Sequence, residues 1–242
     1  MGISSDGRIK FVFIIAVHPS HMRYLDRCIG AIENQSYSNW EIYLCFDGFL
    51  PSKKYGSRVH CFSSEEQEGQ VYWLNLVIRN LNRYTTHFPP KERIYINFHG
   101  ADDWLFNPGV LMEVARVVKN KFLKWVYGSH YTAHQDGIKE VKSQPFNYKK
   151  LLRGNYIAGG AVFVPLETYK EVGSFREIWL SQGADWDMWL RIGEYINPVV
   201  INLPIYFESI GTSMIRPDYK KLSTKIFNRI KYPILRLCRL WK

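Results

Sequence analysis

The chain has 242 residues, of which 46% are hydrophobic and 16% aromatic, so it can bury a substantial core and is not a disordered chain. The formal net charge is +10, but residues 216–242 hold nine Lys or Arg and a single Asp, which gives +8 in this tail alone. A near-neutral body with a basic tail argues against a nucleic-acid-binding domain and favours a surface anchor.

Targeting and redox features point to a cytoplasmic protein that is soluble or peripheral to the membrane. No apolar run approaches the roughly 18 residues that a membrane span requires. The polar segment 1–10 lacks the pattern of a signal peptide. The four cysteines have no CxxC spacing, which favours reduced, buried thiols over a disulfide framework or a zinc site.

The first half of the chain alternates predicted strands and helices. Ile9–Val17 is an apolar, β-branched run and predicts a buried strand, and Ser20 is expected to cap a helix that ends at about Gln35. Glu41–Phe46 predicts a second strand, so the unit is β-α-β and the sheet is expected to be parallel. The next predicted elements are a strand at Arg58–Phe62, a helix at Gly69–Leu81 and a strand at Arg93–Phe98.

The second half continues as an α/β pattern without repeats. Pro108–Asn120 has apolar residues on one face and predicts an amphipathic helix. The other predicted elements are strands at Trp125–Tyr131, Gly159–Val164, Val199–Asn202 and Ile205–Phe207, helices at Glu167–Val172 and Asp185–Tyr195, and a loop or hairpin at His134–Asn147. The pattern predicts one domain, residues 1–215, followed by the tail, residues 216–242.

Two adjacent carboxylates, Asp102 and Asp103, follow the apolar run Ile94–Phe98 after a short polar break. A strand that ends in paired acids delivers carboxylates to the edge of a sheet, where open α/β sheets bind ligands. Two hard oxygen donors there suit Mg²⁺ or Mn²⁺ held together with a substrate phosphate. The alternative is a solvated turn whose acids cap the next helix.

Two further acid sites stand at the ends of predicted elements. Asp47 follows the second strand, which puts it on the same sheet edge as the acid pair, and Asp185 starts a helix. A bound nucleotide diphosphate would use one acceptor for the base or ribose, one carboxylate for a metal and another as general base. Taken alone, Asp47 is more typical of an Asp-Gly turn and Asp185 of a helix cap.

The residues of several segments, and the order of these segments along the chain, resemble those of the inverting family 2 glycosyltransferases. These enzymes have the nucleotide-diphospho-sugar transferase (GT-A) fold. The matching pieces are Phe11–Val17 with Tyr24–Cys28, Asn34–Tyr37 with Trp40–Ile42, Phe46–Gly48, Gly69 with Asn75, Ala101–Trp104, and Val172–Phe175 with Ala184–Arg191. The resemblance covers roughly Ile9 to Met214. It implies an α/β fold: a Rossmann-like, mixed but mostly parallel sheet flanked by helices.

The resemblance implies a donor site for a nucleotide-sugar, usually one that carries UDP. Asp47 would accept from the donor base, and Val17-His18-Pro19 would line the donor site after the first strand. Asp102 would contact the ribose or the metal-bound diphosphate. Asp103 would ligate Mn²⁺ or Mg²⁺, which neutralises the leaving diphosphate.

The resemblance also implies the residues around the reacting sugar. Asp185 would be the catalytic base that removes the proton of the acceptor hydroxyl during in-line attack on the anomeric carbon. Trp186 would line the acceptor side. Gly159 and Gly160 would let the backbone approach the donor sugar closely.

The chain departs from the family pattern at five places: Phe46, Val17-His18-Pro19-Ser20, Leu74, Ala184 and Ser209. Phe46 replaces the first acid of an Asp-Asp-Gly turn, and Ser209 stands where a histidine often completes the metal site. One alternative is therefore a non-catalytic sugar-nucleotide or glycan-binding module. A second alternative, a nucleic-acid-binding protein, is allowed by the tail charge alone and opposed by the acids.

The tail mixes cations with large apolar residues and contains Pro233, which would kink a helix. This composition predicts a basic amphipathic helix on an anionic membrane surface, at the inner face of the membrane. The alternative is a helix packed on the domain's own core. A membrane-bound tail fits a transferase whose acceptor is a growing glycan or is linked to lipid.

Overall fold

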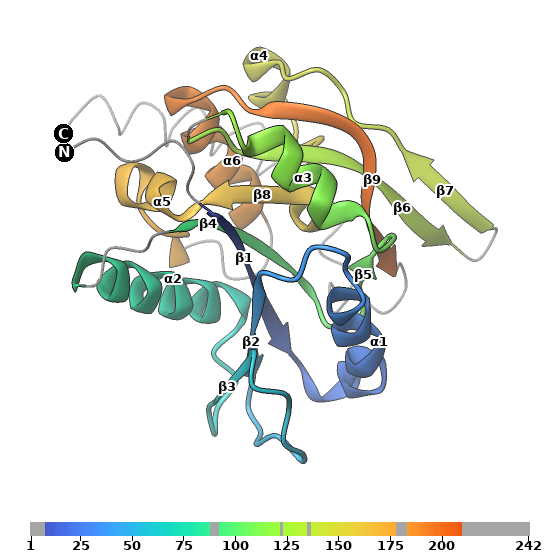
Figure 1. Cartoon of the computed structure of the whole chain (residues 1–242), viewed down its shortest axis with the longest axis vertical. Coiled ribbons are helices and arrows are strands. Elements are labelled where there is room, and N and C mark those ends of the chain that lie inside the picture. Colours follow the sequence, from blue (N-terminus) through green and yellow to red (C-terminus); the bar gives the residue numbers. More distant parts are fainter. Residues whose placement is uncertain (1–7, 88–91, 122, 135–136, 178–182, 210–242) are drawn as a thin grey trace.

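The computed structural model describes residues 8–87, 92–121, 123–134, 137–177 and 183–209. Nine strands in these residues form one sheet with the order β3-β2-β1-β4-β8-β6-β9-β5, and β7 pairs with β6 (Figure 1). The strands are β1 (Arg8–Val17), β2 (Trp40–Phe46), β3 (Val59–Ser63), β4 (Glu92–Gly100), β5 (Trp104–Leu105), β6 (Val126–His134), β7 (Gly137–Val141), β8 (Val162–Pro165) and β9 (Val199–Ser209).

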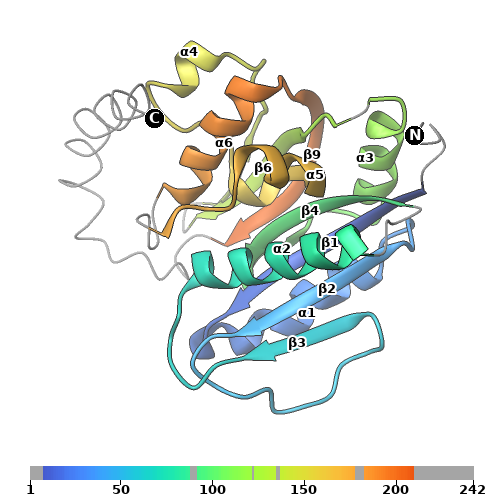
Figure 2. The same cartoon turned by 90° about the vertical axis from the view of Figure 1, so that its left-hand side faces the viewer.

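Helices cover both faces of this sheet. They are α1 (Met22–Glu33), α2 (Gln70–His87), α3 (Val110–Val118), α4 (Tyr148–Leu151), α5 (Leu166–Val172) and α6 (Ala184–Tyr195), with short 3₁₀ turns η1 (Pro19–His21) and η2 (Gly159–Ala161). Figure 2 shows α2 in front of the parallel strands and α1 behind them. One buried apolar cluster joins the sheet to α1 and α3, and a second joins it to α2, α5 and α6.

The first half of the sheet is parallel, as the β-α-β pattern predicts. Strands β3, β2, β1 and β4 all run in the same direction. The runs of β1, β2 and β4 are almost continuously apolar because helices bury both faces, which is the usual composition of parallel strands. The predicted α/β class and mostly parallel sheet are therefore confirmed.

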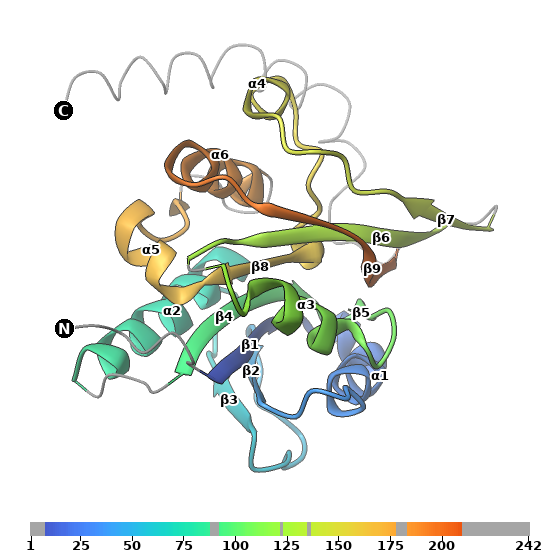
Figure 3. The same ribbon diagram turned by 45° about the horizontal axis from the view of Figure 1, so that its top comes forward.

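The second half of the sheet is mixed. Strand β8 is antiparallel to both β4 and β6, whereas β6 and β9 are parallel. Figure 3 shows β6 and β7 extending together as a hairpin, which confirms the hairpin alternative for this region. The short strand β5, antiparallel to β9, was not predicted, because a two-residue strand leaves no periodic pattern.

Several predicted boundaries differ from the structure; the strand predicted from Gly159, for example, begins at Val162, because Gly159–Ala161 form a 3₁₀ turn. Helix α1 begins at Met22, because Ser20 lies in the preceding 3₁₀ turn, which the His18 side chain caps. Helix α2 runs past the predicted end to His87. The two strands predicted near the end are one strand, β9, which continues through Pro204 because a register irregularity in β6 near Gly128 accommodates it.

The cysteines and the tail bear on where the chain works. Cys28 and Cys45 are free and buried, as expected, and Cys61 is free but exposed. Within the described residues, none of the helices is long and apolar enough to cross a bilayer. The tail, residues 216–242, lies outside the described residues, so its amphipathic helix and its membrane contact stay predictions.

Candidate active site

Strand register brings the predicted site segments to one edge of the sheet. Val17 of β1 is level with Phe46 of β2, and Ala16 of β1 is level with Gly100 of β4. All three strands are parallel, so the residues that follow them leave the same edge. The expectation that Asp47 and the acid pair share the carboxyl edge is confirmed.

Asp47 fastens the start of α2 to this edge. Its Oδ1 accepts hydrogen bonds from the backbone N–H of Glu68 (2.8 Å) and Gly69 (3.1 Å) and from the indole Nε1 of Trp73 (2.9 Å). Its Oδ2 accepts one longer bond, 3.3 Å, from Gly69. The carboxylate therefore has a structural role, and its expected contact with a donor base stays a prediction.

The turn after β1 is tied to the loop before α2. The Nδ1 of His18 accepts a hydrogen bond from the backbone N–H of Ser20, and its Nε2 lies 3.0 Å from Nε2 of Gln67. Gly48 lies beneath this contact with φ of +85°, and a Cβ there would come within 2.8 Å of the Gln67 side chain. This position therefore requires glycine, and the two loops contact each other next to it.

Asp102 is buried and folds back beside its own strand. Its Oδ1 lies 3.7 Å from Nδ1 of His21, and its backbone carbonyl accepts a 2.9 Å bond from the guanidinium of Arg27. The same guanidinium stacks on the ring of Trp104 at 3.6 Å. Arg27 and His21, which the sequence did not single out, thus set the path of the acid pair.

Asp103 meets the far end of the chain's last strand. Its Oδ1 accepts a 2.9 Å hydrogen bond from the backbone N–H of Ser209, the residue predicted to stand where a histidine would be. Burial and then the neighbouring charge of Asp102 raise the pKa of Asp103 to about 8, and Glu208 adds to the effect. In the absence of a cation, this carboxyl group therefore holds its proton at neutral pH.

Asp185 is the first acid of helix α6. Its Oδ2 accepts a 2.9 Å hydrogen bond from Nδ2 of Asn155, and its Oδ1 accepts one from the Trp186 N–H (2.8 Å). Burial raises the pKa of Asp185, although these hydrogen bonds oppose the shift. Asn155 was missed because it lies in a stretch without a helix or strand pattern.

Tyr206 of β9 shows that the acids converge. Burial raises its pKa, and the charges of Glu208, Asp103, Asp185 and Asp102 raise it further. One buried phenol therefore lies within electrostatic range of all four carboxylates, although Asp185 is some 80 residues from the pair in sequence. The sequence did not predict Tyr206 as a site residue, because its position depends on the pairing of β9 with β6.

Gly159 and Gly160 pack closely against neighbouring side chains, Gly159 beside Asp185 and Gly160 beside Tyr206. A Cβ on Gly160 would come within 2.6 Å of the Tyr206 ring, and one on Gly159 would come within 3.1 Å of Phe98 and 3.9 Å of the Asp185 Cβ. The carbonyl of Gly160 accepts a 2.9 Å bond from the side chain of Asn97. Both glycines are therefore required by close packing, and their role toward a donor sugar stays a prediction.

Trp186 does not line an open surface. Its side chain is buried, and its indole N–H donates a 2.7 Å hydrogen bond to the carbonyl of Leu151 in α4. The expected place of Trp186 on the acceptor side stays a prediction. Trp189, three residues on, is also buried, since residues three apart share a helix face.

Other residues of the matching segments build the scaffold behind the site. Asp187 is buried and pairs with Arg191 at 2.8 Å and with Arg176 at 3.3 Å. Arg191 also donates to the carbonyls of Val172, Gly173 and Ser174. This cluster, called here the Arg191 clamp, fixes the start of the loop that precedes α6, at residues 172–174.

The donor set for a cation is small. Among the described residues, no group of three or more His, Cys, Asp or Glu side chains is placed to hold a metal ion. The acid pair can supply carboxylate oxygen, and the raised pKa of Asp103 marks a site where positive charge would be stabilising. The residues present therefore fit a divalent cation that takes its other ligands from diphosphate and water.

Comparisons with known proteins identify the fold. No protein-family model matches the chain, and no curated protein does. Among solved structures, S. aureus TarS matches with a TM-score of 0.62 and 14% identity over 84% of this chain and 37% of that chain. TarS 1-349 in complex with UDP-GlcNAc matches with a TM-score of 0.62 and 12% identity over 83% of this chain and 58% of that one.

A mannosyltransferase from Pyrobaculum calidifontis, solved with GDP-Man and Mn2+, matches with a TM-score of 0.56 and 13% identity. That match covers 98% of this chain and 65% of the other. The chain thus spans between about a third and two thirds of the length of these structures. Identities this low show the fold alone, and they show it consistently: the chain has the GT-A fold of glycosyltransferases that bind nucleotide-sugars.

Proposed function

We propose that the chain is an inverting glycosyltransferase that moves a sugar from a nucleotide-sugar donor, most simply a UDP-sugar, to a hydroxyl of a glycan or lipid-linked acceptor. The observation that carries the proposal is the carboxyl edge of a GT-A sheet, where Asp102 and Asp103 follow β4 and the Gly159-Gly160 turn lies between Asp185 and the Tyr206 ring of β9. Neighbours of this fold were solved with UDP-GlcNAc and with GDP-Man.

Asp185 is assigned the role of general base. A carboxyl group whose pKa is raised by burial is a stronger proton acceptor than an exposed one. Asn155 orients the carboxylate by its bond to Oδ2, so the other lone pairs can face an acceptor hydroxyl. In-line attack by that hydroxyl inverts the anomeric carbon.

Asp103 is assigned to a divalent cation, Mn²⁺ or Mg²⁺. When bound, such a cation neutralises the charge that develops on the leaving diphosphate. The chain supplies the carboxylates of Asp103 and Asp102, while the backbone N–H of Ser209 holds Asp103 in place. The remaining Oδ2 of Asp47 is assigned to the donor base.

The first experiment is a donor panel. The full chain is incubated with UDP-, dTDP- and GDP-sugars, with and without Mn²⁺, and both Tm and nucleoside diphosphate release are followed. One donor should raise Tm only with the cation, and Asp103→Asn should abolish that rise. Asp185→Asn should keep the rise but lose slow release. Asp26→Asn, an exposed aspartate on α1, is the matched control and should behave as wild type.

A non-catalytic binding module is the second candidate function, favoured by Ser209 at the position beside Asp103. A serine backbone N–H contributes no metal ligand, so the cation would be held weakly. This alternative predicts a donor-induced rise in Tm without diphosphate release, even when glycan acceptors are supplied. No response to any sugar nucleotide would overturn both functions.

We also infer that the tail, residues 216–242, holds the enzyme at the inner face of the membrane. Each cation near an anionic surface contributes about 1 kcal/mol. Replacing Lys220, Lys221 and Lys225 with Gln should therefore weaken binding to phosphatidylglycerol vesicles about 100-fold, with little change on phosphatidylcholine. Equal sedimentation of variant and wild type would contradict the anchor.

A further inference from the structure

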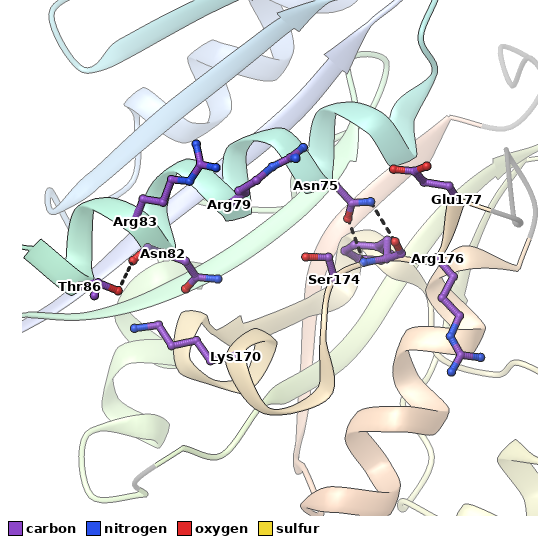
Figure 4. Close-up of a pocket in the computed structure, with 10 residues that line it drawn as sticks. Asn75, Arg79, Asn82, Arg83, Thr86, Lys170, Ser174, Arg176 and Glu177 are labelled. Carbon is purple, nitrogen blue, oxygen red and sulfur yellow. Dashed lines mark hydrogen bonds between the residues drawn. The ribbon is translucent and has the colours of Figure 1, made fainter. Parts of the chain in front are cut away.

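A pocket of about 810 Å³ lies between α2 and α5, and Figure 4 shows its lining side chains. The lining residues are Asn75, Arg79, Asn82, Arg83, Thr86, Lys170, Ser174, Phe175, Arg176 and Glu177. None of the residues assigned to the donor, the cation or the general base is among them. The pocket is therefore a separate feature that the proposed transfer reaction does not use.

The pocket is strongly cationic. Arg79 and Arg83 lie one helical turn apart on α2, and the range Gln70–His87 contains no acidic residue. Among the described residues, no carboxylate lies within ion-pair distance of either guanidinium. Like charges at this spacing repel each other and destabilise a helix. An anion between them would remove that repulsion.

The opposite wall adds another cation. Lys170 of α5 points across the pocket toward α2, as Figure 4 shows, and its Nζ lies 3.4 Å from Oγ1 of Thr85. The other charged lining residues are Arg176, which pairs with Asp187 at 3.3 Å, and Glu177. Arg176 shares Asp187 with Arg191, and apart from Arg176 the pocket has three cations and one carboxylate, so its net charge is positive.

The pocket also contains an unsatisfied amide. The Oδ1 of Asn82 is buried and, among the described residues, receives no hydrogen bond. Its neighbour on the lining, Asn75, differs because both ends of its side chain bond to the backbone of Phe175, at 2.9 Å each. A buried acceptor without a donor is unfavourable, and a small rotation toward a ligand hydroxyl would satisfy it.

From this arrangement we infer that the pocket binds a phosphate ester that also carries hydroxyl groups, such as a polyol or sugar phosphate. The planar guanidinium groups of Arg79 and Arg83 suit bidentate contact with phosphate oxygens, and Lys170 supplies a third positive charge from the facing helix. Asn82 accepts a hydrogen bond from a ligand hydroxyl. This inference does not depend on the proposed transferase activity.

The test measures Kd by calorimetry on the full chain with two probes, glycerol 3-phosphate and inorganic phosphate. The double variant Arg79→Gln/Arg83→Gln should weaken both at least 10-fold. Arg116→Gln/Lys119→Gln removes the same charge from α3 and should leave both Kd values unchanged; both variants alter exposed side chains, and unchanged Tm verifies folding. Equal losses in the two double variants, or no binding to wild type at millimolar probe, would overturn the site.

Two further arms identify the ligand's chemistry and source. Asn82→Leu should weaken glycerol 3-phosphate and spare inorganic phosphate; an equal effect on both would overturn the role of the hydroxyl. Vesicles of phosphatidylglycerol and of phosphatidylcholine are then compared. If Arg79→Gln/Arg83→Gln lowers binding to phosphatidylglycerol, the phosphate ester is a lipid headgroup. If it lowers only glycerol 3-phosphate binding, the ligand is soluble.

Discussion

The acids of the candidate active site and the acid of the Arg191 clamp differ in how the protein meets their charge. Asp187 is buried between two guanidinium groups, so its charge is fully met inside the protein. Asp103 and Asp185 accept hydrogen bonds but have no ion-pair partner among the described residues, and their pKa values are raised. An acid paired with cations holds structure, whereas an acid without such a partner is available for a cation or a proton.

The largest expected effect is a loss of activity when Asp185, an acid of the candidate active site, is replaced. Asp185→Asn should lower donor turnover 10²- to 10⁴-fold, about 3–5 kcal/mol in the barrier, because the amide cannot take a proton. The free energy of unfolding should not fall, since burial already disfavours the charged carboxylate. Diphosphate release and urea denaturation are measured on the same preparation.

The pH profile gives the matching control. The active form of Asp185 is the carboxylate, so the rate should be lost as pH falls through a pKa that lies above the ordinary 3.8. An acid limb at or below 3.8, or a turnover within threefold of wild type in Asp185→Asn, would remove this residue from the reaction.

The second effect is a loss of stability when Asp187, the acid of the Arg191 clamp, is replaced. Asp187→Ala should destabilise the protein by about 3–5 kcal/mol, because it leaves the buried guanidinium of Arg191 without its partner. Urea unfolding measures the loss. Asp187→Asn, which keeps an acceptor for Arg191, should lose less. If Asp187→Ala unfolds at the wild-type midpoint, the clamp does not hold the loop before α6.

The third effect concerns His99, a buried residue of β4. Its ring lies between Sγ of Cys28 (3.4 Å) and Oδ1 of Asn97 (2.9 Å), and burial lowers its pKa from 6.5 to about 4. Below pH 6.5 the unfolded chain binds a proton that the folded chain does not. Stability should therefore fall between pH 6.5 and 4, by about 3 kcal/mol in total.

The variant His99→Gln isolates this contribution. It has no group that titrates in that range, so its free energy of unfolding should depend less steeply on pH between 6.5 and 4 than that of wild type. Chemical denaturation at four or five pH values measures the slopes. Parallel curves for the two proteins would mean that the histidine is protonated in the folded state.

The smallest effect is a gain in stability when Asp103, the residue assigned to the cation, is replaced. Asp103→Asn should stabilise the cation-free protein at pH 5 by about 1–2 kcal/mol, because at this pH burial and Asp102 keep the folded carboxyl group protonated while the unfolded one is ionised. Its Oδ1 can still accept from Ser209. The same variant should lose the rise in Tm caused by Mn²⁺ with a nucleoside diphosphate. A destabilised variant would mean that Asp103 is a structural acid like Asp187.

Local pattern was sufficient for the parallel half of the fold. The apolar runs of β1, β2 and β4 are continuous, and helices separate β1 from β2, so direction, order and the shared edge follow from the sequence. The acids at that edge, Asp47, Asp102 and Asp103, could be found because they directly follow those runs.

The rest of the site depends on long-range pairing. The contact of Ser209 with Asp103 and the place of Tyr206 exist because β9 runs parallel to β6 and continues through Pro204, which a sequence pattern reads as a break. The burial of Trp186 was not predicted either, although Trp186 shares a face of α6 with the buried Trp189, three residues on.

The double duty of Asp47 limits how this protein could be re-engineered. One carboxylate oxygen secures the first residues of α2, and the other is the one assigned to the donor base. A substitution at Asp47 made to alter base preference would also loosen an 18-residue helix. A designer would do better to vary Gln67, whose exposed side chain borders the same turn and holds no helix.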